Sequence, residues 1–188
     1  MAIDFDPTRT WKGLEEKLAT TTNPRHRRML EGVLMHAKSE VAGDLEGVLA
    51  TLAPDPVYRY MPDYPAEGPN GIDAVRDFYV NHIFGAGRHI LEANDDRVIV
   101  DDSTVITEGT MRILQWGHDL AVRGIPIEDP DATYLMAVRL LIIWPFDENC
   151  KILGEESWSQ PVQSLEKVAE EDVPQIFREY IESKLAAA

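Results

Sequence analysis

The chain has 188 residues, and 44% of them are hydrophobic, which is enough to bury the core of one domain of ordinary size. Its 33 acidic and 18 basic residues give a formal charge of −15, which repels phosphate backbones and anionic lipid surfaces. Binding to nucleic acid or membranes is therefore not expected. The N-terminus has no basic region followed by an apolar run, and no stretch approaches the ~20 apolar residues of a spanning helix. The lone Cys150 cannot form an internal disulfide, so we expect a cytoplasmic protein.

The first half of the chain has helical periodicity. Thr22 or Asn23 before Pro24 predicts a helix start, because the side chain caps a free N–H and proline presets φ. From there one apolar stripe runs to about Gly43. A short second helix is expected from Gly43-Asp44, and a strand leaves through Pro54 and Pro56. A loop at 65–71 precedes a further amphipathic helix at 72–83.

In the second half of the chain, apolar and polar residues alternate with a period of two. The pattern predicts strands at 89–93, 97–100, 105–116, 132–144 and 151–158, with a polar loop at 117–131. We expect them to form the long antiparallel strands of a curved sheet. The tail from Ser164 returns to helical spacing, interrupted by Pro174, and would act as a lid or a dimer arm. We divide the chain into an N-terminal extension (1–22), one domain (23–162) and a C-terminal helical tail (163–188).

The order helix, short helix, strand around residues 43–63 resembles the start of a known domain. That domain is shared by nuclear transport factor 2, ketosteroid isomerase, scytalone dehydratase and the SnoaL-like polyketide cyclases. The resemblance spans roughly residues 25–160. It implies an α+β, cone-shaped fold in which a curved antiparallel sheet is wrapped by N-terminal helices around a pocket, here with an extra C-terminal helix. It also implies a homodimer through the sheet, because a second copy usually covers the open outer face in this fold.

Three residues are candidates for catalysis. His89 opens a strand directly after the glycine-rich residues 85–87. The resemblance implies an acid/base role for it, because scytalone dehydratase and hexachlorocyclohexane dehydrochlorinase use a histidine at this point in an elimination. An imidazole titrating near ~6.5 can accept a proton at neutral pH. The resemblance also implies an orienting carboxylate near the end of the first helix, where Glu40 is the nearest acidic residue. Tyr60 matches a tyrosine that helps hold water against the substrate carbonyl in scytalone dehydratase, and its phenol can donate to a developing enolate oxygen.

Further residues are candidates for substrate contact, each with a structural alternative. His36, on the flank of the apolar stripe, is an exposed helix-surface residue or a pocket residue. His82, on the apolar face of its helix, is a core histidine or a pocket residue. Tyr58 shares a strand face with Tyr60 and lines either the pocket or a core edge. A single sequence does not assign the strand faces of the remaining candidates, which are Glu108, Arg112, Trp144, Glu156 and Trp158.

Three functions remain open. The first is a cofactor-independent lyase, isomerase or cyclase acting on a small hydrophobic oxygenated molecule, in which His89 moves a proton, Glu40 orients it and Tyr60 polarises an oxygen. No metal is expected, because no Cys/His pairs occur at zinc spacing. The second function is ligand binding without chemistry. The third follows from the string VYRYMP, which looks like a segment of the structural β subunits of aromatic-ring dioxygenases and would require a large iron-bearing partner. Steroid isomerisation is not expected, because the resemblance places Tyr60 or Met61 where that isomerase has its aspartate base.

Overall fold

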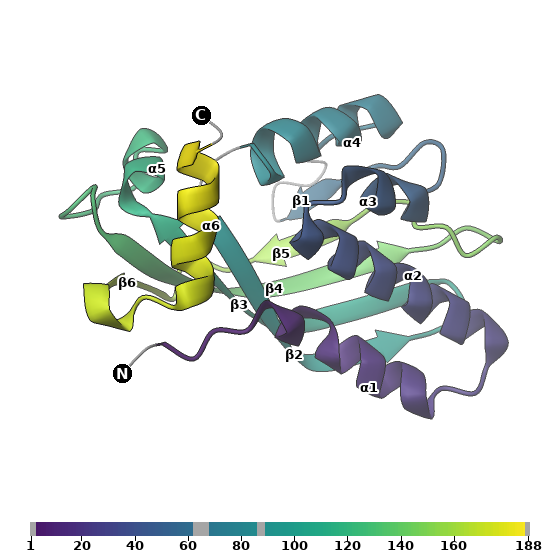
Figure 1. Cartoon of the computed structure of the whole chain (residues 1–188). Coiled ribbons are helices and arrows are strands. Elements are labelled where there is room, and N and C mark those ends of the chain that lie inside the picture. Colours follow the sequence, from purple (N-terminus) through teal and green to yellow (C-terminus); the bar gives the residue numbers. More distant parts are fainter. Residues whose placement is uncertain (1–2, 62–67, 86–88, 187–188) are drawn as a thin grey trace.

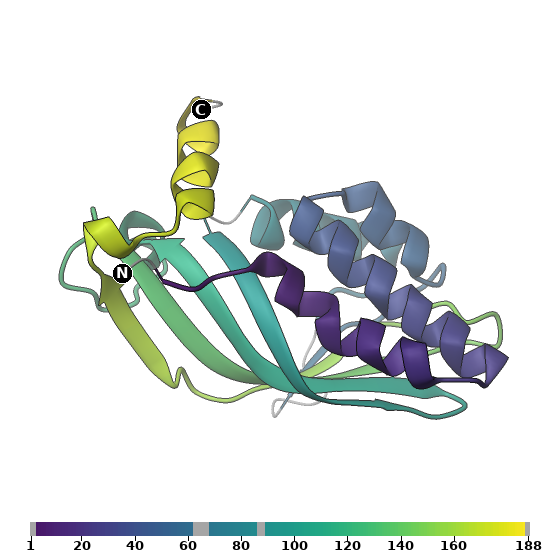
Figure 2. The same ribbon diagram turned by 60° about the horizontal axis from the view of Figure 1, so that its bottom comes forward.

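The computed structural model describes residues 3–61, 68–85 and 89–186 (Figure 1). The fold is α+β, as predicted, with most helices layered on one face of a strongly curved sheet (Figure 2). The helices are α1 (Lys12–Thr20), α2 (Pro24–Ala42), α3 (Leu45–Thr51), α4 (Ile72–Phe78), α5 (Gly117–Val122) and α6 (Gln175–Ala186). Parts of the predicted loop at 65–71 and of the segment at 85–87 lie outside the described residues. Within those residues, no helix is both long enough and apolar enough to cross a bilayer.

Capping residues close in sequence set both ends of α2 and the start of α3. The Asn23 side chain accepts hydrogen bonds from the backbone N–H groups of Arg25 and His26, and Pro24 occupies the first turn. The helix ends at Gly43, whose φ of +70° is the left-handed conformation that glycine adopts without strain. The Asp44 side chain then caps α3 through the N–H of Gly47. The predicted helix start and the short second helix are therefore confirmed.

The sheet has six strands: β1 (Arg59–Met61), β2 (His89–Val100), β3 (Thr104–Trp116), β4 (Thr133–Pro145), β5 (Glu156–Ser159) and β6 (Ser164–Val168). Their order is β1-β5-β4-β3-β2, and β6 pairs with the first half of β4. Among the strand pairs of the described residues, β1–β5 alone is parallel. The register brings Val105 opposite Trp144 and Gln115 opposite Tyr134. Because side chains alternate along a strand, the odd-numbered residues of β3 face the helices and the even-numbered ones face away. We call these sides the inner and outer faces.

Several segments differ from the sequence prediction. The segments predicted at 89–93 and 97–100 form one strand, interrupted by a register shift between Asp95 and Arg97. The polar loop at 117–131 contains α5, and the last long strand begins at Glu156 instead of residue 151. The tail expected to be helical begins as β6, because Val168 packs into an apolar cluster remote in sequence. Such tertiary contacts outweigh local periodicity.

Two apolar clusters hold the fold together. The larger lies between the helices and the inner face and includes Met29, Leu30, Val33, Tyr58 and Trp144. The smaller joins Phe5, Leu114, Val168 and Phe177. Since Leu114 lies on the outer face of β3, the N-terminal segment and α6 cover that end of the outer face, next to Val168 of β6. The helix α6 stands near the start of β2, away from the layer formed by α1–α4 (Figure 2).

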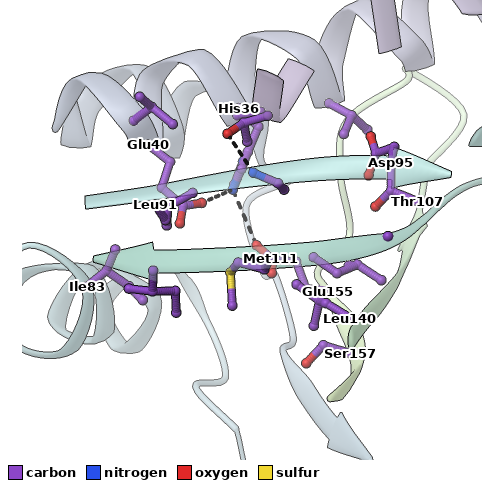
Figure 3. A pocket seen from close by; sticks show the side chains of 18 of the residues that line it. His36, Glu40, Ile83, Leu91, Asp95, Thr107, Met111, Leu140, Glu155 and Ser157 are labelled. Carbon is purple, nitrogen blue, oxygen red and sulfur yellow. Dashed lines mark hydrogen bonds and ion pairs between the residues drawn. The ribbon is translucent and has the colours of Figure 1, made fainter. Parts of the chain in front are cut away.

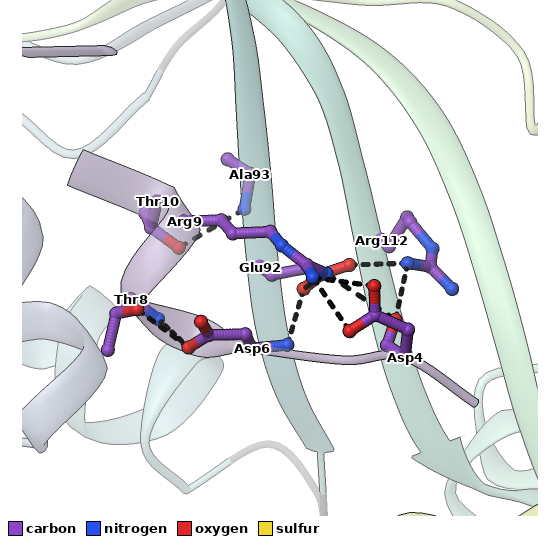
Figure 4. A network of polar contacts seen from close by, with 8 residues as sticks. All are labelled: Asp4, Asp6, Thr8, Arg9, Thr10, Glu92, Ala93 and Arg112. Carbon is purple, nitrogen blue, oxygen red and sulfur yellow. Dashed lines mark hydrogen bonds and ion pairs between the residues drawn. The ribbon is translucent and has the colours of Figure 1, made fainter. Parts of the chain in front are cut away.

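A polar network ties the N-terminal segment to the sheet (Figure 4). The Glu92 side chain is only 3% exposed, although it carries a carboxylate. Its oxygens accept hydrogen bonds from Arg112 Nη1 at 2.5 Å, from Arg9 Nη1 at 3.1 Å and from the backbone N–H of Asp6 at 2.7 Å. Arg9 also binds the Asp4 carboxylate, at 2.7 Å. The residues expected to be an appendage are thus bound to β2 and β3.

Candidate functional site

A cavity of about 370 Å³ lies between the inner face of the sheet and the helices (Figure 3). This volume is typical of small-molecule sites. Its apolar walls include Val33, Leu91, Met111, Ile113, Leu140 and Ile142. A second cavity of about 420 Å³ adjoins it and is bounded on one side by Ile176 and Tyr180 of α6. Glu40 and His89 line both cavities, so they lie where the two meet.

A hydrogen-bond network centred on His36 forms part of the cavity wall. The Thr51 hydroxyl donates to the Val48 carbonyl at 2.6 Å, so its oxygen accepts from His36 Nδ1, 2.8 Å away. His36 Nε2 then faces the Tyr79 hydroxyl at 2.9 Å and Glu155 Oε1 at 3.3 Å. The Tyr79 hydroxyl in turn lies 3.2 Å from Glu155 Oε1. These groups hold the imidazole in one orientation.

The expectation that His36 is an exposed surface residue is wrong, because its side chain is fully buried. Its ring also packs edge-on against Trp144, with 5.2 Å between ring centroids. A polar ring buried in this way needs partners, and α3 and the short π-helix η2 (Tyr79–Ile83) supply them. Those partners come from outside α2, so the helical pattern of α2 alone does not indicate this position.

Glu40 lies one helical turn beyond His36 and opens into the cavity (Figure 3). Its Oε2 is 3.9 Å from His36 Nε2, and 24% of its side chain is exposed. Burial, together with the nearby charge of Glu155, raises the pKa of Glu40 to about 7, although His36 opposes the shift. A carboxyl group with this pKa can both accept and release a proton at neutral pH.

Three tyrosines lie near Glu155, whose charge acts on all of them. Tyr58 and Tyr79 are buried, with their hydroxyl oxygens 3.2 Å apart, and burial raises the pKa of both phenols well above the usual value. Tyr60 lines the cavity from β1, opposite Ser157, and burial raises its pKa to about 12. All three phenols therefore remain protonated at neutral pH and can donate hydrogen bonds. Tyr58 does not line the cavity. It lies behind the residues of the cavity wall, in contact with Tyr79.

The two remaining histidine candidates lie at the cavity. His89 opens β2, is partly buried and faces inward, opposite Gln115. His82 also lines the cavity, but its side chain is exposed and its ring lies 5.8 Å from that of Phe78. The alternative of His82 as a core histidine is therefore wrong.

The strand candidates divide between the two faces. Trp144 faces inward, lines the cavity and donates its indole N–H to Thr107 Oγ1 at 3.0 Å. The other four are on the outer face, away from the cavity. There Glu108 pairs with Arg97 and Arg139, Arg112 with Glu92, and Glu156 with Arg59, while Trp158 is 37% exposed. The cavity therefore brings together His36, Glu40, Tyr60, His82, His89 and Trp144.

Two acidic groups at the cavity were not singled out from the sequence. Asp95 lies on the same face of β2 as His89, and period-two alternation from His89 is a signal that could have included it. Glu155 lies just before β5 in an irregular segment, where no periodicity marks it. Within the described ranges no three His, Cys, Asp or Glu side chains are grouped closely enough to hold a metal ion.

Comparison with known proteins agrees with this architecture. The model of the SnoaL-like domain matches residues 33–134, while no curated protein matches the sequence. A putative SnoaL-like polyketide cyclase from Shewanella denitrificans has a TM-score of 0.56 at 12% identity, covering 85% of this chain and 98% of that one. Δ5-3-ketosteroid isomerase from Mycobacterium sp. has a TM-score of 0.53 at 15% identity, with 75% and 98% covered.

A third similar structure contains a ligand. It is RV0760c from Mycobacterium tuberculosis in complex with estradiol-17β-hemisuccinate, with a TM-score of 0.50 at 19% identity, covering 69% of this chain and 92% of that one. At these identities the structural likeness establishes the fold alone, which isomerases, cyclases and ligand-binding proteins share. The family model, however, matches more than half of the chain. The chain belongs to the family of SnoaL-like domains.

Proposed function

We propose that the cavity binds a small hydrophobic oxygenated molecule and that the protein is a cofactor-independent lyase, isomerase or cyclase that moves a proton on this molecule. The observation that carries the proposal is the Glu40 carboxyl group. It opens into a largely apolar cavity of about 370 Å³, beside the His36 network, and its pKa is raised to about 7. Perturbed carboxyl groups in such cavities are typical of acid/base sites.

The proposed reaction begins with proton abstraction next to a carbonyl. Ionised Glu40 takes a proton from the carbon, and the C–H electron pair moves into the bond toward the carbonyl, whose oxygen becomes an enolate. Tyr60, which stays protonated, donates a hydrogen bond to that oxygen. In an isomerisation Glu40 then returns the proton to a different carbon. In an elimination the enolate electrons form a new C=C bond, the leaving group on the β carbon departs with its electron pair, and protonated Glu40 transfers its proton to that group.

This assignment changes the roles inferred from the sequence, in which His89 is the base and Glu40 orients it. Both residues lie at the junction of the two cavities, and Glu40 has a raised pKa of about 7 and a contact with the buried His36. We therefore propose Glu40 as the base and keep His89 as a second proton-transfer group at the junction. Comparing variants of each residue distinguishes the two assignments.

The test uses 4-phenylcyclohexanone, an apolar ketone with exchangeable α-protons. NMR in D2O follows replacement of these protons by deuterium, with and without the protein. We expect the protein to accelerate exchange above the buffer rate and Glu40→Gln to abolish the acceleration. The matched control is Glu31→Gln, an exposed residue on the same helix. Saturating ligand binding without accelerated exchange would favour the binding-protein alternative instead.

We also propose that the protein is a cytoplasmic homodimer. Apolar side chains remain on the part of the outer face that α6 and the N-terminal segment do not cover, among them Ile99 at 45% and Trp158 at 37% exposure. Exposed apolar groups of this kind on a sheet favour pairing with another surface. The free Cys150 fits a reducing compartment. Light scattering at micromolar concentration tests the dimer.

A further inference from the structure

The second acidic group of the cavity, Asp95, is not used by the proposed reaction. Figure 3 shows Glu40 and Asp95 at opposite ends of the cavity, with His36 between them. Asp95 lines only the first cavity, whereas Glu40 lies at the junction with the second. Among the described residues, none donates a hydrogen bond to the Asp95 carboxyl group or forms an ion pair with it. Its hydrogen-bonding capacity therefore remains available to a ligand.

The local backbone directs Asp95 into the cavity. Asp95 pairs with Gly109 and Arg97 pairs with Glu108, so Asp96 is an extra residue that bulges out of the ladder. The bulge lets Arg97 face outward, where it binds Glu108, while Asp95 stays on the inner face. Bulges of this kind commonly re-aim side chains next to functional sites.

Two glycines make the room that Asp95 occupies. A Cβ atom at Gly109 would lie 2.1 Å from the carbonyl oxygen of Asn94 and 2.8 Å from Cα of Asp95. A Cβ atom at Gly13, on α1, would lie 2.9 Å from Cβ of Asp95. These distances are shorter than a Cβ atom tolerates, so a larger residue at Gly13 would displace the Asp95 side chain and one at Gly109 would displace the backbone of Asn94 and Asp95.

Thr107 complements Asp95 at this end of the cavity. It is two residues from Gly109 on the same face of β3, which makes it a diagonal neighbour of Asp95 across the ladder. Its oxygen already accepts the Trp144 indole N–H, and none of the described residues accepts its hydroxyl hydrogen. A ligand hydroxyl can satisfy both residues, because it donates to a carboxyl oxygen and accepts from a threonine hydroxyl. An ammonium group cannot, because it has no acceptor.

We propose that Asp95 and Thr107 form a hydroxyl-binding subsite at the inner end of the cavity. The ligand is then a hydroxylated carbonyl compound, in which an apolar skeleton separates the hydroxyl group from the carbonyl. This inference rests on the proposed function, which places the carbonyl near Glu40. Burial and the neighbouring charge of Asp96 raise the pKa of Asp95 to about 7, so the group is not a fixed anion that would require a cationic partner.

The test compares three probes with one skeleton by isothermal titration calorimetry at pH 7. They are 4-(4-hydroxyphenyl)cyclohexanone, its 4-methylphenyl analogue and its 4-(aminomethyl)phenyl analogue. We expect the hydroxyl probe to bind at least about tenfold more tightly than the methyl probe, because a specific hydrogen bond is gained without a change of shape. Equal affinity for these two probes, absence of binding included, would overturn the proposal. Tighter binding of the aminomethyl probe would also overturn it, in favour of a cation site.

Variants test which residues cause the preference for the hydroxyl probe over the methyl probe. Asp95→Leu and Thr107→Val should each reduce the preference for hydroxyl over methyl to about twofold or less. Asp96→Asn, the adjacent residue that binds Arg139 outside the cavity, should leave it unchanged. Glu40→Gln should abolish proton exchange yet keep the hydroxyl preference, so failure of the proposed reaction and failure of this subsite give different results. A preference that survives in both Asp95→Leu and Thr107→Val would contradict the assignment.

Discussion

His36 Nε2 lies 2.9 Å from the hydroxyl oxygen of Tyr79, and this contact joins the middle of α2 to the short π-helix that follows α4. The same nitrogen lies 3.3 Å from Glu155 and 3.9 Å from Glu40. The imidazole therefore sits between the two carboxyl groups at one side of the cavity. Its position links the stability of the fold to the electrostatics of the site.

The first prediction concerns this buried ring. His36→Ala removes a fully buried side chain and takes one hydrogen-bond partner from each of the Thr51 and Tyr79 hydroxyl groups, so we expect a loss of about 3 kcal/mol in the free energy of unfolding. Urea denaturation followed by circular dichroism measures it. The control is His26→Ala on the same helix, where the imidazole pairs with an exposed Asp102 and should contribute less than about 1 kcal/mol. Similar losses in both variants would show that the network adds no stability.

The pH dependence of proton exchange identifies the base. Because ionised Glu40 accepts the proton, the exchange rate should rise with pH through a midpoint near its pKa of about 7. Glu40→Gln should remove both the rise and the acceleration. NMR exchange rates between pH 5 and 9, corrected for the buffer reaction, provide the profile. If the midpoint persisted in Glu40→Gln and disappeared in His89→Gln, His89 would be the base.

The sequence predicts α2 well and its chemistry poorly, for a physical reason. The cap at Asn23 and the apolar stripe are local, whereas the partners of His36 lie 15 and 43 residues away. The long strands are likewise visible from alternation. Their faces are not, because register and the bulge after Asp95 decide which side chains reach the cavity. This is why Glu108 and Arg112 could not be separated from inward-facing residues until the pairing was known.

Asp95 should destabilise the ligand-free protein at neutral pH. Its pKa rises from 3.8 to about 7 on folding, so between these values the folded state holds a proton that the unfolded state has lost. The free energy of unfolding therefore falls as pH rises from about 4 to 7 and is fully reduced above 7. Asp95→Asn removes this titration and should stabilise the protein by about 2 kcal/mol at pH 8, with little change at pH 4. Thermal unfolding at both pH values measures the difference, and Asp96→Asn should show no such gain. An equal effect of Asp95→Asn at both pH values would contradict the predicted titration.

Glu92 should anchor the N-terminal segment. Its buried carboxylate binds Arg9, Arg112 and the backbone of Asp6 (Figure 4), so Glu92→Ala leaves two guanidinium groups without their common partner. We expect a loss of about 3 kcal/mol and faster amide hydrogen exchange in residues 3–11. Glu108→Ala, on the same face but more exposed, is the control and should cost less. Unchanged exchange in residues 3–11 would show that this network does not hold the segment.

The last prediction concerns the outer face of the sheet. At the end near Leu114, the chain covers this face with its own Phe5 and Phe177, so we expect a partner copy to pair with the other end, where Ile99 and Trp158 are exposed. Introducing a charge there should prevent pairing, because a carboxylate buried in an apolar interface loses its hydration. We therefore expect light scattering at micromolar concentration to give a dimer for the unmodified protein and a monomer for Trp158→Glu. Val122→Glu, at an exposed apolar residue on α5, should remain dimeric. A monomeric unmodified protein would refute the proposed homodimer, whereas a dimer that persists in Trp158→Glu would place the interface on a different surface.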